Sequence, residues 1–499
     1  MTSHRRDQSR PHRRHGDASD PPEAPGDPGD SGTACDPGQL GQLGQPGTAG
    51  EHGEPGAPGD PGDPGGRGEP DGHGAPRRTR VRIVVVGAGP HGLAAALHLV
   101  AADPGIRDGL VVVDPVGGWL RAWDERFARM EIEHLRSPGV HHPGCDPYGL
   151  VGWTERNGFG SSRRWRYELP DTVAFRAYCR HLVAEADLDE HVVPTRARRL
   201  DAGPDTSTVV LGDGTELVAD HVVVATDPAR RSLPTWVADA LPVPADTMAH
   251  AADVDLRALD GELDGRRVVV LGGGLTAGHL ACGALARGAS VTVLARRPLR
   301  EQMFDTDPGW LGPKHLDRFH RLADPGRRVR VALAARDGGS MPPWMARRLR
   351  AASDRGGLRV LAPARVCGAQ RSGEAIRLVL ADETRVDADR LWLATGTRPD
   401  VTADRLTTGL LVTHPVAVHD GWPALDADLR WPGTNVHLLG RLAMPVLGPA
   451  AGNLWGARVG AARIAETITG GTPPPTGSPL ALVPSGQPTP PAPDRRCPR

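Results

Sequence analysis

Three glycines spaced by two and three residues follow a short β-branched run near the start of the folded sequence. The run extends from Arg82 to Val86, and the glycines are Gly87, Gly89 and Gly92. In a dinucleotide-binding turn, the first glycine makes the tight turn and the second lets the backbone approach a pyrophosphate. The third glycine packs helix against strand. This spacing therefore predicts phosphate binding at the N-terminus of the helix that follows.

The residues around this turn complete the motif. A helical stretch from Leu93 to Val100 follows it, and a second apolar strand over residues 110–113 ends at Asp114. An acid about 20 residues after the glycines accepts hydrogen bonds from ribose hydroxyls. Strand, turn, helix, strand and acid in this order favour a dinucleotide site over a turn with a structural role alone.

The same unit recurs in the middle of the chain. A β-branched strand over residues 267–271 leads into a second glycine turn, which a helix and another strand follow. This turn contains Gly272, Gly274 and Ala277, and the motif allows alanine at the third position. We therefore predict a second dinucleotide site.

Arginines stand where the first unit has its acid. Arg296 and Arg297 follow the strand over residues 290–294. An arginine at this position accommodates the 2′-phosphate of NADP. The second site is therefore predicted to bind NADPH rather than NADH. The alternative is that these arginines are merely exposed.

A further repeat links the two units. Residues 213–227 align without gaps on residues 382–396, and six of the fifteen positions are identical. Each segment is typical of a hairpin turn followed by a buried strand. The predicted fold is α/β, with two Rossmann-like dinucleotide-binding domains, the second inserted in the first.

Both ends of the chain have a different composition. Residues 1–78 are 40% Gly and Pro and contain no Phe, Trp, Tyr, Ile or Val, and residues 470–499 are rich in Pro. Such segments bury too little apolar surface to fold, so we predict disordered tails. Eleven uninterrupted G-X-Y triplets over residues 38–70 are typical of collagen. A solvated tail is favoured over a collagen-like trimer, although another oligomer is possible.

Charge and cysteine usage exclude several classes of protein. The net charge of −1 provides no global field for nucleic acid or an anionic membrane. No run of 18 apolar residues and no signal-like segment occurs, so we predict a cytoplasmic protein without a membrane helix. The six cysteines include no C-x-x-C pair, which argues against a zinc ribbon or a redox dithiol. We predict no metal site.

These motifs together resemble the two-dinucleotide-binding-domain flavoproteins. In that group the N-terminal motif holds FAD and the central motif holds NAD(P)H. The missing cysteine pair separates this chain from the thioredoxin-reductase and glutathione-reductase branches and leaves the class B flavin monooxygenases. The resemblance implies an FAD-binding domain formed by residues 79–262 and 399–469, with an NAD(P)H-binding domain at 263–398.

Finer features are similar to the lysine and ornithine N-hydroxylases. A G-x-W segment ending at Trp119 resembles the segment that passes the flavin in these enzymes. The segment H-L-R-S-P that begins at His134, with His142 after it, resembles one that lines the flavin. Phe175 and Tyr178 match a helix of that family. His134 and His142 are candidate catalytic residues, with a structural role as the alternative.

Other positions depart from the family pattern. Asp227 stands where glycine is usual, and Arg441 stands where many relatives have an aspartate for the FAD ribityl chain. The linker at His250 lacks the Ser and Tyr of the family's H-S-x-x-Y. The segment from Gly448 to Asn453 is expected to open a helix that faces the flavin, or else only to pack.

The resemblance implies an FAD-dependent, NADPH-using monooxygenase. Such an enzyme hydroxylates an amine or other soft nucleophile with O₂ through a C4a-hydroperoxyflavin, and its protein supplies positioning and excludes water. The predicted partners are therefore a small-molecule substrate and O₂. The alternatives are an FAD-dependent NAD(P)H oxidoreductase or oxidase that does not oxygenate a substrate, and a non-catalytic redox-regulatory flavoprotein.

Overall fold

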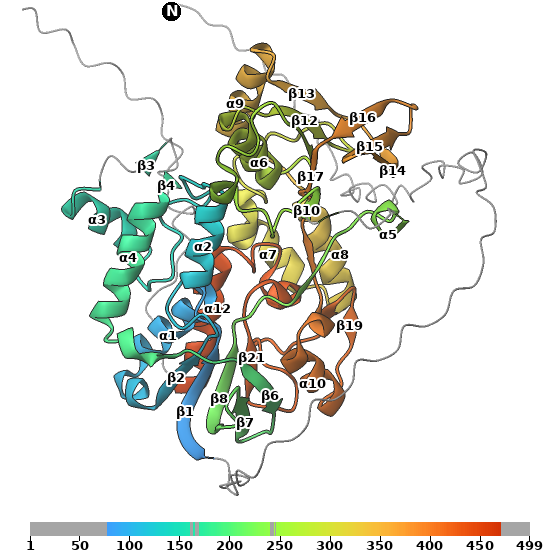
Figure 1. Ribbon diagram of the computed structural model, residues 1–499. Coiled ribbons are helices and arrows are strands. Elements are labelled where there is room, and N and C mark those ends of the chain that lie inside the picture. The colour runs from blue at the N-terminus through green and yellow to red at the C-terminus, as the bar shows by residue number, and fades with distance from the viewer. Residues whose placement is uncertain (1–76, 160–162, 165–168, 240–243, 245, 471–499) are drawn as a thin grey trace, which may run out of the picture. The chain divides into compact units, whose positions relative to one another are not determined.

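The first sheet is built around β1 (Arg78–Val86), whose last four residues are apolar and buried. In the computed structural model, β1 pairs in parallel with β2 (Leu110–Val113) and with β8 (Glu216–Val224) (Figure 1). Continuous apolar runs are typical of parallel strands that are covered on both faces. The first predicted strand and the strand at 110–113 are therefore confirmed.

The structure describes residues 77–159, 163–164, 169–239, 244 and 246–470, all within the unit Gly65–Arg499. The predicted N-terminal tail, including its G-X-Y triplets, lies outside the described residues except at 77 and 78, as does the C-terminal tail except at 470. The first sheet has the order β5-β2-β1-β8-β7-β6, and β21 also pairs with β8. Its other strands are β5 (Val192–Val193), β6 (Ala197–Asp201), β7 (Ser207–Leu211) and β21 (Val436–Leu438).

The described α-helices are α1 (Pro90–Ala102), α2 (Arg121–Arg129), α3 (Gly149–Arg156), α4 (Thr172–Glu185), α5 (Trp236–Asp239), α6 (Leu275–Ala286), α7 (Pro313–His320), α8 (Pro325–Arg336), α9 (Pro343–Asp354), α10 (Arg405–Thr413), α11 (Met444–Leu447) and α12 (Leu454–Thr469). Three pairs of short strands complete the description: β3 (Arg163–Arg164) with β4 (Leu169–Pro170), β9 (Ala229–Arg231) with β18 (Thr397–Pro399), and β19 (Val418–His419) with β20 (Trp422–Pro423). No helix among the described residues is long and apolar enough to span a bilayer.

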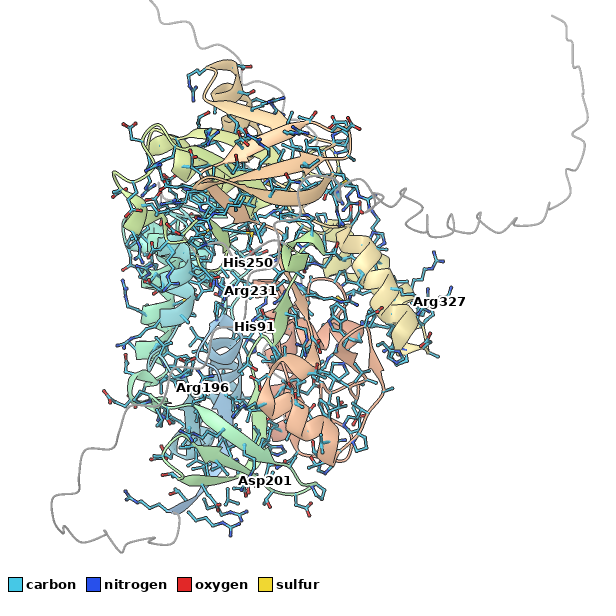
Figure 2. All side chains as sticks on the ribbon, turned by 45° about the vertical axis from the view of Figure 1, so that its right-hand side comes forward. His91, Arg196, Asp201, Arg231, His250 and Arg327 are labelled. Carbon is cyan, nitrogen blue, oxygen red and sulfur yellow. The ribbon has the colours of Figure 1, made fainter. Side chains whose placement is uncertain are left out.

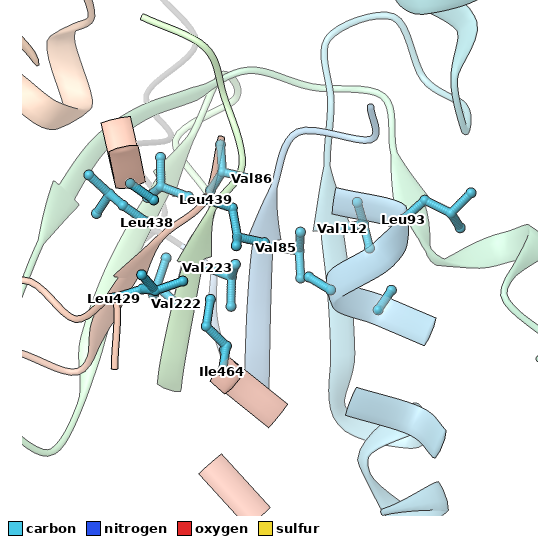
Figure 3. Close-up of a cluster of buried hydrophobic side chains, with 14 of the residues drawn as sticks. Val85, Val86, Leu93, Val112, Val222, Val223, Leu429, Leu438, Leu439 and Ile464 are labelled. Atoms are coloured by element: carbon cyan, nitrogen blue, oxygen red, sulfur yellow. The ribbon is translucent and has the colours of Figure 1, made fainter. Parts of the chain in front are cut away.

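Helices α1 and α12 pack on each other beside this sheet. Their contact is made by Ala94, Ala457 and Ala461, which are fully buried together. Short side chains at a helix contact reduce the distance between the helix axes. Ile464 of α12 then reaches the buried valines of the sheet, including Val222 (Figure 3). The C-terminal helix thereby closes the core that the first strand begins.

The second sheet has the order β10-β17-β11-β12-β13, and all of its pairs are parallel. Its strands are β10 (Met248–His250), β11 (Arg267–Leu271), β12 (Ser290–Leu294), β13 (Leu358–Leu361) and β17 (Arg390–Leu393). Helices α6 and α9 share one buried cluster with it. A second cluster joins it to the small antiparallel sheet of β14 (Val366–Ser372), β15 (Ala375–Leu380) and β16 (Arg385–Ala388). The two predicted dinucleotide-binding units are confirmed.

The internal repeat appears as the same local structure twice. Thr215 N donates to Asp213 Oδ1 and Thr384 N donates to Asp382 Oδ1, each at 3.0 Å, so both hairpin turns close in the same way. The strand after each turn continues into the parallel sheet. In the first unit it is the single strand β8, whereas in the second it is divided into β16 and β17.

The cores do not follow the predicted boundaries at every point. Phe319 of α7 and Val329 of α8 belong to the buried cluster of the first sheet, although both helices fall within residues 263–398. Strand β10 pairs with β17 of the second sheet, although it precedes residue 263. Packing between segments that are distant in sequence decides to which core each element belongs. The local sequence pattern does not predict this packing.

Candidate functional site

The first glycine turn leaves an open face at the N-terminus of α1. Gly87 has φ +108°, and a Cβ atom there would lie 3.1 Å from the carbonyl oxygen of Ala225. A Cβ on Gly92 would collide with the carbonyl oxygen of Gly87, whereas one on Gly89 would meet nothing within 4 Å. The backbone at Gly89 is therefore accessible to a phosphate, as a dinucleotide turn requires.

Asp114 holds this turn in shape. Its Oδ2 accepts from Ala88 N at 3.0 Å, and its Oδ1 accepts from Val116 N at 2.8 Å. We predict that the carboxylate, which remains partly exposed, also receives ribose hydroxyls. The acid at this position therefore has a second role, because it fixes the backbone that approaches the phosphate.

The G-x-W segment returns to the same turn. Leu120 N donates to Ala88 O at 2.8 Å, which places the segment beside the glycines. The indole Nε1 of Trp119 donates to Leu188 O at 2.9 Å. This N–H is already used within the protein, so only the ring of Trp119 is left for contact with a cofactor.

The second glycine turn has the same backbone conformation, but a loop of the protein packs against it. Gly272 has φ +150°, and a Cβ atom there would collide with the carbonyl oxygen of Ala394, the counterpart of Ala225. The loop of residues 337–340 crosses this turn, because Leu275 N donates to Ser340 O at 3.1 Å and a Cβ on Gly274 would lie 3.5 Å from Gly339 Cα. Ala277 is buried at the third position.

Thr226 and Thr395 occupy equivalent positions after the two closing strands. The hydroxyl oxygen of each is buried and has no hydrogen-bond partner among the described residues. Thr226 N also lies beside Gly87, 3.5 Å from a Cβ built there. A buried hydroxyl without a partner costs about 1–3 kcal/mol, so a ligand that bonds to it is favoured. Both turns therefore fit a dinucleotide.

The two predicted phosphate-binding arginines have different surroundings. Arg297 Nη1 lies 3.1 Å from Asp337 Oδ1, and both side chains are about half exposed. Arg296 is exposed, and no ion pair joins it to another described residue. Arg297 and Arg300, which both pair with Asp337, are therefore the arginines held in place near this turn.

The candidate histidines are held by the protein itself. His142 Nδ1 accepts from Gly144 N at 3.2 Å, so its Nε2 carries the proton and donates to Pro147 O at 3.3 Å. Burial lowers the pKa of His142 to about 3, which keeps the ring neutral. His134 lies in a β-bridge opposite Asp171. These contacts support the structural alternative for His142.

A cavity of about 100 Å³ opens beside the H-L-R-S-P segment. Its walls come from that segment, from residues 304–311 and from the start of α12, and they include Arg136, His141, Asp305, Leu311, Asn453 and Trp455. The cavity therefore joins three segments that lie far apart in the sequence. No group of three or more potential metal ligands occurs in the described part of the chain.

Arg136 and Asp305 are the charged side chains of this cavity. Arg136 donates to the carbonyl oxygens of Gln302 and Met303, both at 2.9 Å, and to Ser340 Oγ at 2.8 Å, and burial lowers its pKa to about 10. Asp305 accepts from Arg336 at 2.8 Å. The family-like motif contained Arg136, but no local signal marked Asp305.

The segment before α12 differs from its prediction. The helix begins at Leu454, and Gly448, with φ +84°, ends the short helix α11 instead of opening α12. A Cβ on Gly448 would lie 2.9 Å from Leu316, so the chain turns there against α7. Asn453 stands at the N-cap, but its Nδ2 donates to Asp305 Oδ1 at 3.2 Å. The side chain of Asn453 therefore lines the cavity instead of capping α12.

The two departures near the first turn pair with each other. Arg441 Nε lies 2.7 Å from Asp227 Oδ1, and its Nη2 lies 2.6 Å from Asp227 Oδ2. Arg441 Nη1 also donates to Thr397 Oγ1 at 3.0 Å, in strand β18. An acid at 227 and a base at 441 thus form a bidentate ion pair next to the links between the two sheets.

The linker at His250 is also built from internal contacts. His250 Nδ1 accepts from Ala252 N at 3.2 Å, so Nε2 donates to Gly396 O at 3.1 Å. Arg231 pairs with Asp253 of the same linker. Figure 2 shows His250 and Arg231 near each other, with His91 of α1 below them. Backbone contacts of His250 and the Arg231–Asp253 ion pair therefore hold this linker, which lacks the Ser and Tyr of the family pattern.

Family comparisons support this assignment of the fold. Residues 84–228 match a family described as FAD-NAD(P)-binding, and residues 174–309 match one described as pyridine nucleotide-disulphide oxidoreductase. No curated protein matches the chain by sequence.

Several solved structures share the fold. An ornithine N-hydroxylase of Kutzneria sp. 744 superimposes with a TM-score of 0.64 at 18% identity, over 78% of this chain and 99% of its own. The ornithine hydroxylase of Pseudomonas aeruginosa gives 0.63 at 15%, over 79% and 99%. The L-lysine 6-monooxygenase of Pseudomonas syringae gives 0.60 at 18%, over 78% and 99%. The predicted fold and its resemblance to these enzymes are confirmed at the level of structure.

Proposed function

We propose that this chain is an FAD-dependent, NADPH-using monooxygenase that hydroxylates an amine or another soft nucleophile. The observation that carries the proposal is the pair of glycine turns, each with a buried threonine hydroxyl that has no partner in the described part of the chain. Two dinucleotide sites in one chain suit an enzyme that passes reducing equivalents from one bound nucleotide to another. The similarity to N-hydroxylases supports the choice of reaction.

The residues of the first turn would hold FAD. Gly87, Gly89 and Gly92 would hold its pyrophosphate at α1, Asp114 its ribose, and the ring of Trp119 would lie beside it. At the second turn, Gly272, Gly274 and Ala277 would hold the pyrophosphate of NADPH, with Arg297 near its 2′-phosphate. The bound flavin supplies the transfer of electrons from NADPH to O₂.

The cavity has a composition suited to an amine. Leu311 and Trp455 supply apolar walls that exclude water, and Asp305 supplies a carboxylate that can accept a hydrogen bond from the N–H of a neutral amine. Arg136 is occupied by main-chain carbonyls and Ser340. We therefore assign Asp305 the role of orienting the substrate amine.

The balanced reaction consumes one amine, one O₂, one NADPH and one proton. It forms one hydroxylamine, one water and one NADP⁺. The test is to incubate the purified holoprotein with NADPH and a panel of alkyl and arylalkyl amines, and to measure NADPH loss, peroxide and products with the mass of one added oxygen. Product close to one per NADPH is expected. Peroxide in equal amount to NADPH with every amine would contradict oxygenation.

An NADPH oxidase is the second candidate, because Asp305 is already paired with Arg336 and Asn453. The variant Asp305→Asn separates the two functions. Under the proposal it shifts turnover from product to peroxide, because the amine is no longer oriented. An oxidase without an amine site would keep the same peroxide yield in the variant. Protein purified without flavin, and unable to take it up, would contradict both.

A further inference from the structure

Asp337 presents three oxygen atoms to two arginines that follow β12. Its carboxylate oxygens lie 3.1 Å from Arg297 Nη1 and 2.5 Å from Arg300 Nη1. Its carbonyl oxygen accepts from Arg300 Nη1 at 2.6 Å and from Arg297 Nη2 at 3.4 Å. A phosphomonoester also offers three terminal oxygens to arginine. The two arginines thus already hold three oxygens of one residue, two from its carboxylate and one from its main-chain carbonyl.

This contact lies where a dinucleotide would place its 2′-phosphate. That group is received by an arginine near the end of the second strand of the unit, which here is β12. The same loop reaches the N-terminus of α6, where Leu275 N donates to Ser340 O at 3.1 Å. Residues 337–340 therefore link the two arginines, which Asp337 contacts, to the N-terminus of α6, which Ser340 contacts.

The backbone keeps the loop in this position. Asp337 has φ +41° at the C-cap of α8, and a Cβ on the following Gly338 would collide with Arg297 Nη2. Arg136 holds the far end of the loop through Ser340 Oγ at 2.8 Å. Aspartate and asparagine both tolerate this left-handed conformation, so the charge of Asp337 can be removed without changing the backbone.

We propose that Asp337 occupies the 2′-phosphate position on Arg297 and Arg300 in the protein without coenzyme, and that NADPH binds by displacing it. Arg300 is then the second phosphate-reading residue, in place of Arg296. Asp337 is an internal competitor that sets how tightly a 2′-phosphate binds, with no effect on a nucleotide that lacks one. This inference rests on the proposed function, which assigns NADPH to the second turn.

The experiment measures binding of 2′,5′-ADP and 5′-AMP to the holoprotein by calorimetry, with NADPH and NADH as further ligands. In Asp337→Asn, 2′,5′-ADP and NADPH are expected to bind roughly three- to tenfold more tightly, the range expected for loss of exposed ion pairs that compete with the ligand. Binding of 5′-AMP and NADH should not change. Arg300→Ala should weaken 2′,5′-ADP roughly tenfold, because a bond to a charged group is lost.

Asp420→Asn is the matched control. Asp420 also has a positive φ, of +53°, and pairs with Arg398 at 3.1 Å, and its side-chain exposure of 53% is close to the 54% of Asp337. It belongs to the turn between β19 and β20, away from β12. Its substitution should leave the affinity for all four ligands unchanged.

Each outcome bears on one of the two proposals. Tighter 2′,5′-ADP binding in Asp337→Asn alone supports the competitor. Unchanged binding in this variant, with wild-type protein still preferring NADPH to NADH, overturns the competitor and leaves the proposed function standing. Equal tightening in Asp420→Asn also overturns it, because the effect would then follow net charge. Failure of every protein to bind either coenzyme contradicts both proposals.

Discussion

The two glycine turns have the same backbone and opposite surroundings. At the first turn, Asp114 accepts a hydrogen bond from Ala88 N, and no atom lies within 4 Å of a Cβ built on Gly89. At the second turn, Arg297 stands in the region of the acid, and the loop of residues 337–340 lies against Gly274. The first turn is therefore accessible at Gly89, whereas the second turn lies against the loop whose Asp337 pairs with Arg297 and Arg300.

This difference matches the roles that we propose for the two sites. A cofactor that stays bound gains from a site that is already organised, because little is lost in ordering it. A coenzyme that must leave after each reaction gains from a site whose own loop competes with it. The contrast can be tested by changes that affect one turn and not the other.

The largest effect is expected for Gly92→Ala. The new methyl group would collide with the carbonyl oxygen of Gly87, and backbone cannot move away as a flexible side chain does. We expect a loss of at least about 3 kcal/mol of stability and no retained flavin, measured by chemical unfolding and by the ratio of flavin to protein absorbance. Gly89→Ala, with no atom within 4 Å, is the control for folding. Equal stability of the two variants would show that the turn is not constrained as described.

Acid should weaken the first unit before the second. Burial lowers the pKa values of His141 and His142 to about 3, and that of His98 to about 4, whereas the described second unit has one comparable histidine, His279, at about 4. Unfolded histidine binds a proton near pH 6.5 and these folded rings do not, so stability falls as the pH decreases from 6.5 toward 3. The slope is about 1.4 kcal/mol per pH unit for each such histidine.

Hydrogen exchange between pH 7 and pH 4.5 provides the measurement. Segments around residues 93–100 and 138–147 should lose protection at a higher pH than residues 268–285. The variant His142→Asn keeps an acceptor for Gly144 N and removes one titrating group, so its unfolding free energy should depend less steeply on pH. Simultaneous loss of protection in both units would contradict this difference.

Breaking the Asp227–Arg441 pair should have a smaller effect. The pair is bidentate but partly exposed, with 27% of the Arg441 side chain accessible, so Arg441→Ala should cost about 1 kcal/mol. The exchanged variant, with Asp227→Arg and Arg441→Asp together, should recover part of that loss. A double-mutant cycle in urea gives the coupling free energy. A coupling of zero would mean that the two departures from the family pattern are independent.

The smallest effect is expected for Ala277→Gly at the second turn. This change restores the glycine of the first turn and should cost only about 0.5–1 kcal/mol, the usual difference between glycine and alanine within a helix. Thermal unfolding measures it, and NADPH affinity should remain as in the wild type. A large loss of affinity would show that the third position of the two turns is not equivalent.

Much of the fold could be predicted because it depends on local pattern. The strand at residues 267–271 and the helix ending at residue 286 have the bounds that periodicity indicated. The sequence predicts that α12 begins near Gly448, but it begins at Leu454. The apolar stretch from Gly448 contains no local signal for the turn that packs it against α7. Helix α8 was not predicted, since the small buried residues Gly326, Val329 and Ala332 form a weak apolar face among four arginines.

Only the parts of the candidate site that lie within a sequence motif could be predicted. Glycine spacing is constrained by backbone sterics at neighbouring positions, so both turns could be located from the sequence alone. The contacts of Asp305 and Asp337 join segments that are distant in sequence, and their positions depend on packing of whole helices. His142 was a candidate by type, but its tautomer and burial depend on the fold around it.

The amino-acid sequence by itself determined that there are two related dinucleotide-binding units and where their glycine turns lie. This is because turn conformation and the continuous apolar runs of buried parallel strands are set by residues that are adjacent in the chain. Only the tertiary structure decided that Asp227 meets Arg441 and that one turn is open while Asp337 occupies the arginines of the other. Such pairings depend on the geometry that brings distant segments into contact, and no local pattern encodes that geometry.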